Sequence, residues 1–193
     1  MSEESVLPIP NLRLPEHHFV LGTPSLTRLH ERAREQLLAG IRADAMAPYL
    51  RALVAGGTLP ADASLLEKLE AENKKEMDEF ARRQEEAEKL EGETDVVEVL
   101  RDRANYLTKI GDKVCLPRPA SCSCLFSNAI QDAALEAQKL ALEKSVGAGQ
   151  KIDIVLTLVR VGFFFGDNAL VTEQLAKAEE RVLGVGGGEM TER

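Results

Sequence analysis

The chain has 193 residues, of which 44% are hydrophobic, 29% are charged and only 4% are aromatic, and its formal net charge is -8. These proportions are typical of a soluble globular protein, and a core built mainly from Leu, Val, Ile and Ala favours packed helices over a β-sandwich. The acidic balance argues against a general nucleic-acid binder, and no apolar run is long enough to predict a membrane-spanning helix.

The amino-terminal stretch MSEESVLPIPNLRLPEHH is acidic and interrupted by proline. It lacks the basic start and the apolar segment of a secretory signal peptide. Cytoplasm and nucleus are therefore the expected locations, and the cysteines are expected to be free thiols.

The first predicted unit is a flexible, extended arm over residues 1–23, because three prolines and no helical periodicity occur there. Thr23 and Pro24 then predict a helix start, with threonine as the N-cap and proline at the first helical position. The apolar residues that follow at helical spacing are Leu26, Leu29, Ala33, Leu37 and Ile41. A short helix over residues 46–55 is expected next, ended by two glycines.

A long, highly charged helix is predicted over residues 64–90, because Ser64 and Glu67 have the spacing of a capping box. Its favourably ordered i,i+4 pairs are Glu70/Lys74, Glu79/Arg83 and Glu85/Lys89. Its apolar stripe is thin, and polar residues interrupt the heptad line. This pattern predicts a solvated helix edge rather than a continuous coiled coil.

The remaining pattern predicts four more helices, over residues 95–110, 129–146, 150–165 and 168–183, with Gly111 after the first of them. Residues 114–131 form an irregular insertion, and residues 184–193 form a glycine-rich tail. Helices joined by short glycine-containing turns indicate an all-α, helical-hairpin (TPR-like) solenoid over residues 24–183, with a right-handed stack.

No constellation of catalytic or metal-binding residues is evident. Cys115, Cys122 and Cys124 are three ligands, whereas a structural zinc site needs four. The histidines, His17, His18 and His30, all fall in the first thirty residues and are expected to be exposed to solvent. Phosphate-loop, dinucleotide and nucleophile-elbow motifs do not occur. We expect no enzyme activity, no cofactor and no metal.

Three stretches resemble the family of the seventh non-ATPase subunit of the 26S proteasome regulatory particle. They are residues 46–49 (MAPY), 106–113 (YLTKIGDK) and 151–170 (KIDIVLTLVRVGFFFGDNAL), in the family's order and spacing. The positions that the resemblance marks as structural or interaction residues are Met46, Ala47, Pro48, Tyr49, Tyr106, Gly111, Asp112, Asp153, Arg160, Gly162 and Asp167. The resemblance extends over roughly residues 30 to 183.

This resemblance implies a non-catalytic scaffold subunit of the regulatory particle lid that supports ubiquitin-dependent protein degradation. The implied partners are other lid subunits and the ATPase ring, with no nucleic acid, membrane or small-molecule substrate. Two alternatives stay open: an independent helical-repeat adaptor that binds peptide segments, and the paralogous first subunit of the signalosome.

The chain departs from the family pattern in two places. Family members continue into a PCI domain, whereas this chain ends at residue 193, so we expect it to be truncated, marginally stable and poorly incorporated. The segment 114–131 has no counterpart in the family. It begins with valine, whose codons start with GT, and ends with glutamine, which can be encoded by CAG. We therefore expect a translated intron, with a genuine surface loop as the alternative.

Overall fold

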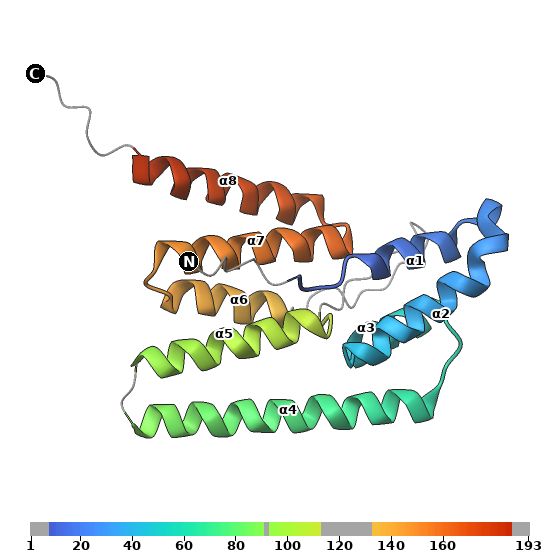
Figure 1. The fold of residues 1–193 in the computed structure, drawn as a ribbon, viewed down its shortest axis with the longest axis horizontal. Helices are drawn as coiled ribbons and strands as arrows, with labels where there is room; N and C mark the ends of the chain where they lie inside the picture. Colours follow the sequence, from blue (N-terminus) through green and yellow to red (C-terminus); the bar gives the residue numbers. More distant parts are fainter. Residues whose placement is uncertain (1–7, 91–92, 113–132, 187–193) are drawn as a thin grey trace, which may run out of the picture.

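The computed structural model describes residues 8–90, 93–112 and 133–186, and every regular element in these ranges is a helix (Figure 1). In chain order the elements are α1 (Arg13–Gly22), the short 3-10 helix η1 (Pro24–Leu26), α2 (Thr27–Ala43), α3 (Ala47–Ala55), α4 (Ala63–Lys89), α5 (Glu93–Lys109), α6 (Ala133–Lys144), α7 (Ala148–Phe165) and α8 (Asn168–Gly186). The all-α prediction is confirmed; the TPR-like detail stays a prediction.

The helices α4 to α8 lie side by side in successive layers, and α1, α2 and α3 lie together at one end of that stack (Figure 1). Two main groups of buried side chains hold this arrangement together. The first cluster joins α1 to α4, and Phe164 of α7 also belongs to it. The second cluster joins α5, α6, α7 and α8 around Leu158. Each helix buries its apolar face only against its neighbouring helices, so the stability of each layer depends on the layers beside it.

The extended arm predicted over residues 1–23 is wrong for its second half, where α1 forms. Pro15 lies in the first turn of α1, where the missing N–H has no helical partner to lose. Leu14 is 1% exposed, and a Cβ on Gly40 of α2 would lie only 2.4 Å from Leu14 Cδ2. The close approach of α1 to α2, which local periodicity does not show, therefore stabilises this helix.

Some helix ends match the caps that the sequence predicts, and others do not. Thr23 is the N-cap residue of η1 and Pro24 follows it as predicted, but the Thr23 hydroxyl makes no capping hydrogen bond and donates to the Phe19 carbonyl instead. The cap of α4 is Asp62, whose carboxylate accepts from the Leu65 amide at 3.0 Å, rather than Ser64. At the end of α5, Gly111 adopts a left-handed φ of 69°, which confirms it as the terminating glycine.

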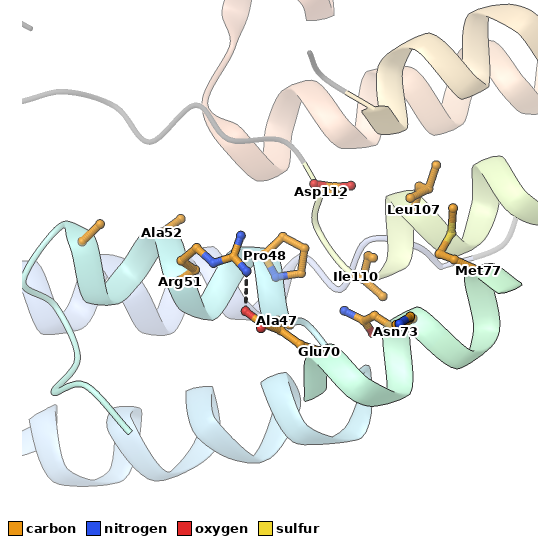
Figure 2. Close-up of a pocket in the computed structure, with 12 residues that line it drawn as sticks. Ala47, Pro48, Arg51, Ala52, Glu70, Asn73, Met77, Leu107, Ile110 and Asp112 are labelled. Atoms are coloured by element: carbon orange, nitrogen blue, oxygen red, sulfur yellow. Dashed lines mark hydrogen bonds and ion pairs between the residues drawn. The ribbon is translucent and has the colours of Figure 1, made fainter. Parts of the chain in front are cut away.

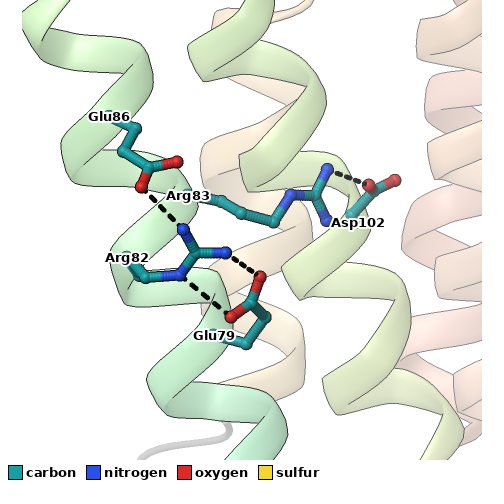
Figure 3. Close-up of polar contacts among 5 residues, drawn as sticks. All are labelled: Glu79, Arg82, Arg83, Glu86 and Asp102. Carbon is teal, nitrogen blue, oxygen red and sulfur yellow. Dashed lines mark hydrogen bonds and ion pairs between the residues drawn. The ribbon is translucent and has the colours of Figure 1, made fainter.

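The long charged helix is confirmed as α4, but only one of its three predicted ion pairs forms as expected. Lys89 Nζ lies 2.7 Å from Glu85 Oε1. Glu70 pairs with Arg51 of α3. Arg82 forms ion pairs with both Glu79 and Glu86 (Figure 3). Arg83 instead reaches across to Asp102 of α5 at 3.1 Å. These pairs are substantially exposed, so each contributes little to stability.

The helix predicted over residues 150–165 is confirmed as α7. Three of the predicted segments lie wholly or partly outside the described residues: the insertion 114–131, the first seven residues of the arm, and residues 187–193 of the tail. The predicted intron therefore stays a prediction. Among the helices that are described, none is both long and apolar enough to cross a lipid bilayer.

Candidate functional site

Residues from all three family-like stretches meet at the first cluster, to which Met46, Tyr49 and Phe164 belong. A Cβ on Gly111 would lie 3.0 Å from Met46 Cε and 3.2 Å from Tyr49 Cβ, so the end of α5 packs directly on the start of α3. The ring of Tyr49 lies 5.0 Å from that of Phe164 on α7, measured between centroids. We call this group, Met46, Tyr49, Gly111 and Phe164, the seam. Its contacts join segments that are far apart in the sequence.

Tyr106 links α5 to α4. Its hydroxyl donates to Asn73 Oδ1 at 3.0 Å, and its ring lies 5.6 Å from that of Phe80. Burial, together with the nearby carboxylates of Glu76 and Glu72, raises the pKa of Tyr106 to about 12. The phenol therefore stays protonated at neutral pH and keeps donating to the largely buried Asn73.

The third stretch supplies contacts within α7 and α8. Asp167 caps α8, because its Oδ1 accepts from the Leu170 amide at 3.0 Å. The Asp153 carbonyl accepts from the Thr157 hydroxyl at 2.9 Å, within α7. Arg160 donates to main-chain carbonyls of the amino-terminal segment. These family-like positions therefore carry packing and helix-end contacts.

At Gly162 the helices α7 and α8 approach each other closely. A Cβ there would lie 2.6 Å from Val171 Cγ2 and 3.2 Å from the Asp167 carbonyl oxygen. Replacing Gly162 by alanine is expected to lower the free energy of unfolding by about 1–2 kcal/mol, because overpacking outweighs the gain in helix propensity. Urea unfolding followed by circular dichroism measures this.

The matched control is Gly149→Ala in the same helix, where a Cβ meets nothing within 4 Å. This variant is expected to unfold at the same or a higher urea concentration, with a gain of at most about 1 kcal/mol. Equal changes in the two variants would contradict the close-approach explanation.

A groove with a volume of about 640 Å3 opens between α3, α4 and the end of α5 (Figure 2). The family-like residues Ala47, Pro48 and Asp112 line it. Its other lining residues, most of them apolar, are Arg51, Ala52, Ala55, Glu70, Asn73, Lys74, Met77, Leu107 and Ile110. An apolar floor with a charged rim suits an amphipathic protein segment. Among the described residues that line the groove there is no histidine, cysteine or hydroxyl side chain that could act as a nucleophile or its base.

Sequence reasoning singled out neither Arg51 nor Met77 as candidate groove residues. Nothing local marks them, because the groove exists only after α3 is placed against α4. Arg51 carries a tertiary ion pair with Glu70 across the groove, drawn in Figure 2.

The histidines are not the freely exposed side chains that the sequence predicted. His18 is half-buried, its Nε2 lies 3.2 Å from Thr58 Oγ1, and burial lowers its pKa. His30 Nε2 lies 3.1 Å from the Thr23 carbonyl oxygen. In the part of the chain that the structure describes, no group of three potential ligands could hold a metal ion. The three cysteines lie outside that part.

Comparisons with known proteins give a consistent result. Residues 128–192 match the family model described as 26S proteasome subunit RPN7. The chain is similar to 26S proteasome non-ATPase regulatory subunit 6 of Caenorhabditis elegans, with 33% identity over 172 residues that cover 89% of this chain and 38% of the relative. The 26S proteasome regulatory subunit RPN7 of Saccharomyces cerevisiae is 29% identical over 192 residues, covering 86% of this chain and 40% of the relative.

The similarity extends to plants. The homologue of non-ATPase regulatory subunit 6 in Arabidopsis thaliana is 31% identical over 172 residues, covering 89% of this chain and 40% of that protein. The chain thus spans about two fifths of the length of the curated relatives it matches.

Proposed function

We propose that the chain belongs to the 26S proteasome subunit RPN7 family, whose model matches residues 128–192, and that it is a non-catalytic scaffold of the proteasome regulatory particle lid. In this role it positions neighbouring subunits for ubiquitin-dependent protein degradation and performs no chemistry itself. The proposed partners are other lid subunits and the ATPase ring, and the proposed locations are the cytoplasm and the nucleus.

This proposal is supported by the packing contacts that the family-like residues make. Met46, Tyr49 and Gly111 pack against one another in the seam, and Gly162 and Asp167 set the turn between α7 and α8. None of these contacts assembles an acid, a base and a nucleophile around a pocket. Residues that fix how helical layers join are what a scaffold requires, because a scaffold acts by holding its surfaces at set positions.

A tagged copy of the chain, expressed in cells that contain intact proteasomes, tests the proposal. Mass spectrometry of the affinity-purified material is expected to recover other regulatory-particle subunits well above an untagged control. Recovery of none of them, from a chain that circular dichroism shows to be helical, would falsify the scaffold role.

A second candidate function, an independent helical-repeat adaptor, is favoured by the groove between α3, α4 and α5. In that role the groove would bind peptide segments of unrelated clients. Arg51→Glu tests it, because this substitution places a negative charge beside Glu70 at the rim of the groove. The matched control is Arg32→Glu on the exposed face of α2. Loss of unrelated clients only in the first variant would support the adaptor over the lid scaffold.

A further inference from the structure

The amino-terminal residues 8–12, which we call the strap, lie against α7 although some 150 residues separate them in the sequence. The Arg160 side chain donates two hydrogen bonds to this segment. We propose that Arg160 is a latch, which holds the strap on α7 and thereby joins the first helices of the stack to the last hairpin as one body.

The geometry of the latch is specific. Arg160 Nε donates to the Ile9 carbonyl oxygen at 3.0 Å, and Nη2 donates to the Pro10 carbonyl oxygen at 3.3 Å. The guanidinium therefore binds two successive main-chain carbonyls with two of its donors, a fork that the single ammonium of lysine cannot reproduce. Because the acceptors are main-chain atoms, the latch depends on the path of the strap rather than on its side chains.

The strap continues directly into α1, so holding one positions the other. Leu14, at the start of α1, is 1% exposed and lies against Gly40 of α2. The helix α1 also contacts α7 itself, near the end of the stack where Figure 1 shows the two together. A chain of contacts thus runs from Arg160 through the strap and Leu14 to α2.

The contact between α3 and α7 near this junction is apolar, because the rings of Tyr49 and Phe164 meet in the seam. An ion pair joins the end of α5 to the end of α2, where Lys109 Nζ lies 3.6 Å from Asp44 Oδ1. Apolar contact has no directional preference, whereas the hydrogen bonds of Arg160 fix the strap in one register. Removing the guanidinium should therefore release the strap and α1 while the seam keeps the remaining helices packed.

Limited trypsin digestion of the full chain tests the latch. The reporter is the bond after Arg13, because Leu14 is buried while α1 is docked. Arg160→Ala is expected to increase the cleavage rate at this bond about tenfold or more, since proteolysis follows the population of the undocked state. Arg160→Lys should give an intermediate rate. Lys151→Ala, on the same helix but away from the strap, should leave the rate unchanged.

Hydrogen exchange monitored by mass spectrometry separates a latch from a general loss of stability. In Arg160→Ala, faster exchange confined to residues 8–22 supports the proposal, with α5 to α8 as protected as in the parent. Unchanged exchange and unchanged cleavage at Arg13 would overturn it. Faster exchange throughout the chain would also overturn it, because Arg160 would then be an ordinary stability determinant.

Discussion

Replacing Leu158 by alanine is expected to lower the free energy of unfolding by about 2–5 kcal/mol. Leu158 is fully buried at 0% exposure in the middle of α7, within the second cluster. The substitution removes apolar contact with α5, α6 and α8 and leaves a cavity that the helices around it can fill only in part. Urea unfolding followed by helical circular dichroism should show a lower midpoint with an unchanged slope.

The matched control is the same substitution at Leu175 on α8, whose side chain is 43% exposed. Little buried surface is lost there, so we expect a change within about 0.5–1 kcal/mol. A cost at Leu175 equal to that at Leu158 would contradict the placement of the core between α5, α6, α7 and α8.

Replacing Gly111 by alanine is expected to cost about 2–4 kcal/mol, from two separate effects. The left-handed φ of 69° strains any residue with a Cβ. That Cβ would also lie 3.0 Å from Met46 Cε and 3.2 Å from Tyr49 Cβ, so the seam must open to admit it. Thermal and urea unfolding of the purified variant measure the sum.

Gly57→Ala separates these two effects. Gly57 has a similar φ of 73°, but a Cβ there meets nothing within 4 Å. Its substitution should cost about 1 kcal/mol, which is the conformational strain alone. The excess at Gly111 then measures the tightness of the seam, and no excess would mean that α3 and α5 do not pack as closely as described.

Much of the helical architecture was determined by local sequence. The helices predicted over residues 46–55, 64–90 and 150–165 form within a few residues of the predicted ends, because apolar spacing, charge and glycine act within one or two turns. Gly111 was predictable for the same reason, since few other residues end a helix with a left-handed φ. The family resemblance depends on three short sequence segments that occur in the family's order, so it can also be recognised without a structure.

Tertiary structure alone decided how those local units meet. The prolines that predicted an extended arm also permit α1, and tertiary contacts such as that between Leu14 and Gly40 favour the helix. Glu70 pairs with Arg51 rather than Lys74 because packing brings α3 beside α4. The seam, the groove and the latch of Arg160 on Ile9 join residues many turns apart. Local periodicity shows which face of a helix is apolar but not which neighbour covers it, because burial is a property of the assembled stack.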